Sequence, residues 1–360
     1  MDAPFLLLQL CFFVSGFAAL LYETAWTREL ASVFGTSELA VSAVLAAYMG
    51  GLALGAALIA RWAPRVRRPV LVYGLLELGI AAGALWVPFA IRLLSGLYVE
   101  WLGGLDTPPA QLGLVTALFH LGGTFLVLLP CTTLMGATLP LLARYAVRND
   151  DEIGPRIGLL YGVNTGGAIL GALAAAFLLL PSLGLRQTIY FGAAANTLVF
   201  LAAAGLSRLS RPTPPGSAPP AAEGGSPFTA RSAILPLIAL SGMVSFIYEV
   251  LWVRILGYVL GGSTAAFASM LSSFLLGIAL GSAAASRLAR TPRQAAMGFA
   301  IAQLGTAFFA SLSFGLANWI PEIARELGAG ISNLAPGALI SVVVLLPTTL
   351  CIGATFPFAV

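Results

Sequence analysis

The sequence has 360 residues, of which 59% are hydrophobic and 9% are charged, and its formal net charge is +4 at pH 7. Soluble domains carry roughly a quarter charged residues, so this composition excludes a chain that folds mainly in water. All 18 basic residues are arginines, and they gather in alternate loops rather than along a basic, aromatic stripe, which argues against nucleic-acid binding. We therefore expect an all-α, polytopic membrane protein.

Apolar stretches that could each cross a bilayer core of roughly 30 Å follow one another along the chain. The first domain, residues 1–206, is predicted to contain six helices, over 5–34, 39–61, 70–94, 112–143, 156–181 and 186–206. Residues 207–231 are rich in Pro, Gly and Ser, as is typical of a flexible linker. The second domain, residues 232–360, is predicted to contain four helices, over 233–260, 264–287, 295–320 and 335–358.

The second domain repeats the first. The pattern Tyr-Glu-x-x-Trp-x-Arg occurs at residues 22–28 and again at 248–254, an offset of 226 residues. Further matches are Gly51 and Gly55 with Gly277 and Gly281, and Pro130, Gly136 and Pro140 with Pro347, Gly353 and Pro357. Because six helices precede the second copy, the repeat is expected to be parallel, and by symmetry two more helices should follow Val360.

Arginine counts predict the orientation of the helices. The loops at 61–68, 144–156, 207–231 and 287–293 hold 13 arginines, whereas the opposite loops hold only three. Loops rich in Lys and Arg face the cytoplasm, so the amino terminus is predicted to lie inside the cell. The three cysteines lie in apolar runs without metal-ligand spacing, so neither a metal site nor a cofactor is predicted.

Ionisable residues within the apolar stretches are candidates for a solute or ion pathway, because a charge at mid-bilayer costs about 3 kcal/mol on insertion scales. Glu and Arg five residues apart do not share a helix face, so we predict that Glu23 pairs with Arg254 and Glu249 with Arg28. The alternative is anchoring at the membrane interface. The full set of candidates is Glu23, Arg28, Glu249, Arg254, Glu77 and His120.

Several other residues invite a functional and a structural interpretation. The paired prolines of the fourth and tenth helices, with Gly136 and Gly353 between them, are typical of interrupted helices at a transporter's binding site, or of ordinary kinks satisfied by nearby threonines. The glycine pairs predict close helix packing. For His120 and Asn196 we favour contacts between helices over a proton relay or ligand binding.

Two resemblances follow from these motifs. The six-helix plan and the loop after Gly55, with its four arginines, resemble the major facilitator superfamily, although Pro64 and Val66 stand where that family carries an acidic residue and a glycine. A closer resemblance is to the membrane region of bacterial spermidine-synthase-like proteins, in which such a region precedes an aminopropyltransferase-type domain. It rests on Ser15–Ala18, Tyr22–Arg28, Gly51–Gly55, Met135–Pro140 and Leu160–Gly167.

The second resemblance implies polyamine-linked biology in the bacterial cytoplasmic (inner) membrane. The enzyme half of such proteins binds decarboxylated S-adenosylmethionine on a Rossmann-like sheet, and these 360 residues contain no such segment, so no catalytic residue is predicted. Two functions are expected. One is a transporter-like module in the lipid bilayer for a small cationic solute such as a polyamine. The other is a non-transporting platform for a soluble synthase domain or partner.

Overall fold

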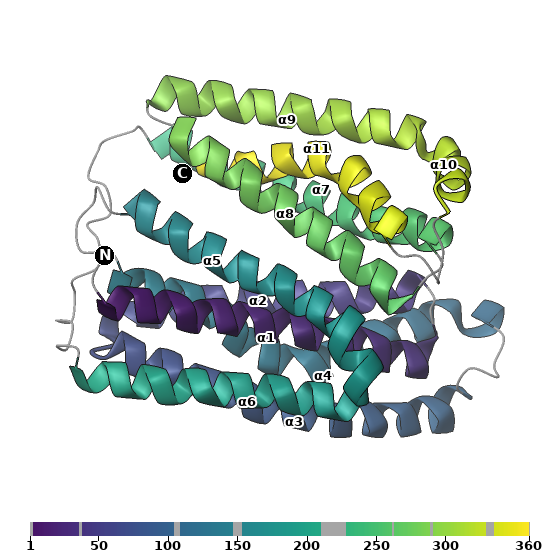
Figure 1. Ribbon diagram of the computed structural model, residues 1–360, viewed down its shortest axis with the longest axis horizontal. Coiled ribbons are helices and arrows are strands. Elements are labelled where there is room, and N and C mark those ends of the chain that lie inside the picture. The colour runs from purple at the N-terminus through teal and green to yellow at the C-terminus, as the bar shows by residue number, and fades with distance from the viewer. Residues whose placement is uncertain are drawn as a thin grey trace. The chain divides into compact units, whose positions relative to one another are not determined.

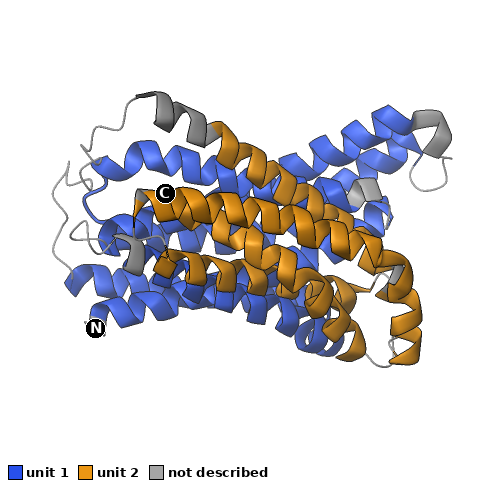
Figure 2. Ribbon diagram, turned by 90° about the horizontal axis from the view of Figure 1, so that it is seen from above, with its two compact units in different colours: residues 1–220 blue, residues 221–360 orange. Residues whose placement is uncertain are grey.

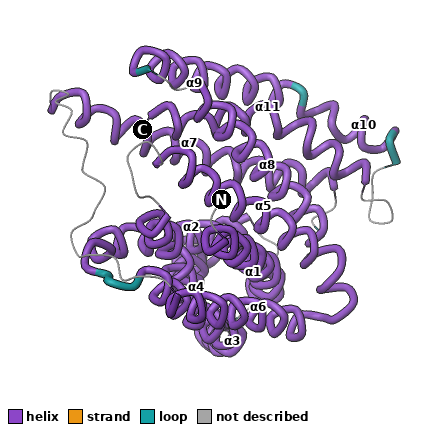
Figure 3. Tube along the Cα trace, turned by 60° about the vertical axis from the view of Figure 1, so that its left-hand side comes forward, coloured by secondary structure: helices purple, strands orange, loops and turns teal. Residues whose placement is uncertain are grey.

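The computed structural model describes residues 3–35, 38–103, 109–146, 153–209, 228–260, 263–288, 291–328 and 335–359. These residues are almost entirely helical, and no strand occurs among them (Figure 3). The all-α prediction is therefore confirmed. The chain divides into two compact units, residues 1–220 and 221–360 (Figure 2).

The described residues of unit 1 form a bundle of six long helices, whose packing can be followed in Figure 1. The core of the bundle forms where α2 packs against α4, α1 against α5 and α6, and α3 against α4 and α6. Two short turns, η1 (Ala63–Arg65) and the π-helical η4 (Ala175–Leu179), lie between the long helices. The helices are α1 (Ala3–Phe34), α2 (Glu38–Trp62), α3 (Pro69–Leu102), α4 (Pro109–Ala146), α5 (Ile153–Ala174) and α6 (Leu180–Leu209).

The part of unit 2 that the structure describes has four long helices, which are α7 (Phe228–Leu260), α8 (Thr264–Leu288), α9 (Pro292–Gly315) and α11 (Ala335–Ala359). A 3-10 turn η5 (Ala317–Trp319) and the short helix α10 (Ile320–Glu326) follow α9. Helix α11 packs against α8 and α9, and α7 packs against α8 and α11. The pairs α2–α4 and α8–α11, which the repeat aligns, are thus packed in both units.

Nine apolar stretches among the described residues are long and apolar enough to cross a membrane, which fits a multi-pass membrane protein. One of them, residues 156–209, has 54 residues, and a straight helix of that length would reach about 80 Å. Gly184 interrupts it with φ 76° and ψ 175°, a conformation that favours glycine. The predicted helices 156–181 and 186–206 lie on either side of this glycine, and this stretch accounts for the difference between nine and ten.

Several helix ends differ from the prediction, and those of α3 and α9 are examples. Helix α3 continues through Ser95 and Gly96 to Leu102, and ends where Gly103 adopts φ 73° and donates its N–H to the carbonyls of Tyr98 and Val99. A left-handed glycine of this kind is a common helix terminator. Helix α9 ends at Gly315, before the predicted residue 320, and a 3-10 turn follows. The predicted linker lies largely outside the described residues, between Leu209 and Phe228.

Glycines bring the helices of each unit together at aligned positions. A Cβ at Gly51 would overlap the hydroxyl of Thr132, and a Cβ at Gly277 would overlap that of Thr349. The backbone carbonyls that face the other glycines leave no room for a side chain either. These contacts join Gly55 to Thr133, Gly281 to Leu350, Gly136 to Leu52 and Gly353 to Ile278. Helix backbones that touch in this way gain van der Waals energy that lipid cannot supply.

Candidate functional site

The core of unit 1 contains a buried polar cluster, here called the Glu77 network, formed by Glu77, Ser15, Asn196 and Tyr22. Glu77 lies on α3 and is completely buried. The Ser15 hydroxyl on α1 donates to Glu77 Oε1 at 2.6 Å, and Asn196 Nδ2 on α6 donates to Glu77 Oε2 at 2.6 Å. Each carboxyl oxygen of Glu77 therefore accepts a hydrogen bond from a different helix.

Tyr22 extends the Glu77 network along α1. Its hydroxyl donates to Asn196 Oδ1 at 2.7 Å, and its ring stacks on Trp26 with 5.2 Å between centroids. A Cβ at Gly192 would lie 2.6 Å from the Tyr22 ring, so α6 reaches this position only with a glycine there. Because Gly192 and Asn196 are one helical turn apart, the same close approach brings the Asn196 amide within reach of Tyr22.

The hydrogen bonds of the Glu77 network join α1, α3 and α6, so the network acts as a clamp between these helices. Buried polar groups in a low-dielectric interior are costly unless every partner is present, and here both oxygens of Glu77 and both ends of the Asn196 amide are engaged. Asn196 bridges helices, as the sequence interpretation favoured. The sequence does not identify Ser15 and Asn196 as the partners of Glu77; its only signal is that both are polar residues within apolar helices.

In unit 2 the sequence positions aligned with the Glu77 network are only partly the same. The repeat aligns Ser241 with Ser15 and Tyr248 with Tyr22, but it aligns Gln303 with Glu77. Gln303 is only partly buried. The acidic group is thus present in one unit and replaced by an amide in the other, whereas Glu23 and Glu249 are acidic in both.

Glu23 and Glu249 are both buried, on α1 and α7 respectively. Arg28 and Arg254, five residues further along the same helices, are both exposed. The same alternation of buried acid and exposed base therefore recurs in each unit. The pairing of Glu23 with Arg254 and of Glu249 with Arg28 stays a prediction.

His120 lies on α4 within an aromatic cluster. Its ring centroid is 4.1 Å from that of Phe34 on α1 and 5.3 Å from that of Tyr98 on α3. The side chain is buried, and neither ring nitrogen has a hydrogen-bond partner among the described residues. The structure therefore places His120 as an aromatic contact between three helices.

The paired prolines lie inside continuous helices. Helix α4 runs through Pro130 and Pro140, and α11 runs through Pro347 and Pro357. A proline removes one backbone hydrogen bond from a helix. Close to it, the Thr132 hydroxyl donates to the Leu128 carbonyl, and the aligned Thr349 hydroxyl donates to the Leu345 carbonyl, both at 2.9 Å. Neither helix is divided into two halves at these residues.

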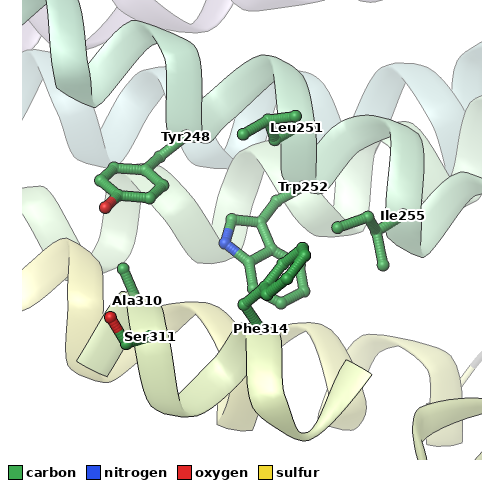
Figure 4. Close-up of a pocket in the computed structure, with 7 residues that line it drawn as sticks. All are labelled: Tyr248, Leu251, Trp252, Ile255, Ala310, Ser311 and Phe314. Atoms are coloured by element: carbon green, nitrogen blue, oxygen red, sulfur yellow. The ribbon is translucent and has the colours of Figure 1, made fainter. Parts of the chain in front are cut away.

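Unit 2 contains a pocket of about 200 Å³ between α7 and α9 (Figure 4). The aromatic rings of Tyr248 and Trp252 on α7 and of Phe314 on α9 line it, together with Ser311 and aliphatic side chains. The lining carries no charged side chain. Among the described residues, no group of three or more His, Cys, Asp and Glu side chains could hold a metal ion.

Comparisons with known proteins find distant relatives of the chain. No protein-family profile matches it. Polyamine aminopropyltransferases of Mycobacterium tuberculosis (strains CDC 1551 / Oshkosh and ATCC 25618 / H37Rv) and of Mycobacterium bovis are each 32% identical to it over 197 residues. The chain is distantly similar to these enzymes. The match covers 52% of this chain but only 32% of each relative.

The fold indicates which part of the structure the match to these relatives covers. Any 197 consecutive residues of this chain consist mainly of long apolar helices. The similarity to the mycobacterial polyamine aminopropyltransferases therefore concerns membrane-like helices. Their remaining two thirds have no counterpart in the matched stretch.

Proposed function

We propose that the chain is the membrane platform of a polyamine-synthesising protein, which holds an aminopropyltransferase domain at the cytoplasmic face of the bacterial inner membrane. The observation that carries the proposal is the 32% identity to polyamine aminopropyltransferases. This identity lies in a chain whose described residues are almost entirely helical. A helical scaffold shared with such enzymes favours a role in placing the enzyme.

The packing and charge of the chain support a platform. The Glu77 network and the glycine contacts hold the helices of unit 1 closely together, as expected of a rigid scaffold. We further propose ten membrane spans in two major-facilitator-like repeats, with the amino terminus in the cytoplasm. The arginine-rich loops would then face the compartment that contains polyamines and decarboxylated S-adenosylmethionine.

The platform is tested by recovering the chain from membranes of its own host. The tagged chain, extracted in mild detergent, is expected to co-purify with an enzyme activity that transfers an aminopropyl group from decarboxylated S-adenosylmethionine to putrescine. An unrelated multi-pass protein with the same tag, recovered at equal yield, serves as the control. Absence of this activity from the intact, monodisperse chain would contradict the platform.

A second candidate function is passage of a small organic cation such as a polyamine across the membrane. The observation that favours it is the buried acid at the same position of both units, Glu23 and Glu249. Acidic residues within a membrane are expensive and often line cation pathways. The carboxylate of either residue would attract an ammonium group of a polyamine.

Transport is tested in proteoliposomes with labelled putrescine and spermidine. If Glu23 and Glu249 bind the cation, Glu23→Gln and Glu249→Gln each lower uptake by about tenfold or more, because the counter-charge is lost. The matched control is Glu322→Gln, since Glu322 is exposed and forms an ion pair with exposed Arg325, 3.8 Å away. No uptake by the intact protein, or equal loss in all three variants, would refute a cation pathway through these residues.

A further inference from the structure

Helices α1 and α7 occupy aligned positions in the repeat but are covered to very different extents. In the most apolar 18-residue stretch of α1, 56% of the residues are buried, compared with 11% in the corresponding stretch of α7. Leu21 of α1 is fully buried, whereas Ile247, which the repeat aligns with it, is 48% exposed. In unit 1 the covering helices are α5 and α6.

A glycine shared by both helices marks where α5 lies on α1. A Cβ at Gly16 would lie 2.7 Å from the side-chain nitrogen of Asn164 on α5 and would overlap the Asn164 backbone carbonyl. The aligned residue in α7 is Gly242, and a Cβ there would meet nothing within 4 Å. Glycine destabilises a helix relative to alanine, and among the described residues of unit 2 no contact at Gly242 offsets that cost.

The pocket of unit 2 lies where α6 packs in unit 1. Helix α6 contacts both α1 and α3, with Gly192 against the Tyr22 ring and Asn196 accepting from the Tyr22 hydroxyl. The aligned helices α7 and α9 instead border the 200 Å³ pocket, which Tyr248 and Trp252 line (Figure 4). The Tyr248 hydroxyl has no hydrogen-bond partner among the described residues.

We propose that unit 2 binds a pair of apolar helices of the α5–α6 kind, one on the α7 face around Gly242 and the other in the pocket between α7 and α9. The chemistry of this partner is fixed by unit 1. The first helix places its backbone against Gly242. The second carries a small residue against the Tyr248 ring and, one turn later, an amide that accepts from the Tyr248 hydroxyl. Association in lipid depends on such close packing and on hydrogen bonds between helices.

Cross-linking tests the proposal with the full chain and a defined probe. Residues 153–209, which contain α5 and α6, are co-expressed as a separate tagged segment with Asn164→Cys. The full chain, with its three native cysteines replaced by alanine, carries Gly242→Cys. The control is Gly257→Cys, because Gly257 also lies on α7 with nothing within 4 Å of its Cβ position, but aligns with Ala31 in α1.

We expect a disulfide cross-link between the segment and Gly242→Cys at about tenfold the level seen with Gly257→Cys. In the native-cysteine chain, Gly242→Leu should lower co-purification of the unmodified segment by about the same factor, which corresponds to 1.4 kcal/mol, and Gly257→Leu should not. If lipid alone covers this face of α7, the segment cross-links at neither position or equally at both. That result would overturn the proposal.

Discussion

Gly136→Leu is expected to destabilise unit 1 by about 3 kcal/mol or more, and we expect much of the variant to be lost from the membrane. A Cβ at Gly136 would lie 2.6 Å from Leu52 Cα and would overlap the Leu52 carbonyl. The obstacle is the backbone of α2 itself, so no change of side-chain rotamer can relieve it. The two helices would have to separate along their length, and the contacts of Gly51 and Gly55 with α4 would be lost as well.

The matched control is Gly122→Leu on the same helix. Gly122 is exposed, and its Cβ position meets nothing within 4 Å, so this change should alter stability by less than about 0.5 kcal/mol. The measurement is the thermal unfolding midpoint of purified protein in detergent. Equal midpoints for the two variants would show that α2 and α4 are not in contact at Gly136.

The apolar character of the chain was sufficient to predict its helices, because a bilayer demands long apolar stretches with internally satisfied backbones. The repeat predicted which glycines correspond, and the structure shows corresponding contacts for Gly51 and Gly277. Helix ends were less predictable. Ser95 and Gly96 are weak terminators compared with a left-handed glycine, and only backbone geometry identified Gly103 as the residue that ends α3.

The partners of Glu77 could not be predicted from the sequence. Ser15 and Asn196 lie 62 and 119 residues away from it, and their contact depends on how α1, α3 and α6 pack. The proline segments were ambiguous for a different reason. A proline next to hydroxyl side chains is compatible with a broken helix and with a continuous one, and the packing of α4 against α2 and α3 determines which is formed.

Replacing Glu77 should show whether its carboxyl group stabilises the packing of the helices or is required for function. Glu77→Leu removes the acceptor of two buried hydrogen bonds and leaves the Ser15 hydroxyl and the Asn196 Nδ2 group unsatisfied. Each orphaned group costs about 1–3 kcal/mol, so we expect a loss of about 3 kcal/mol. The unfolding midpoint in detergent measures this loss. A midpoint equal to that of the wild type would show that the Glu77 network contributes nothing to stability.

Glu77→Gln is the matched isosteric control, with an expected loss of about 1 kcal/mol. The amide oxygen can still accept from Asn196, and the amide N–H can donate to the Ser15 hydroxyl oxygen, so every buried group keeps a partner. If the variant retains stability but loses polyamine uptake, the carboxyl group itself is required for function. If it retains both, Glu77 acts only as the clamp that joins α1, α3 and α6.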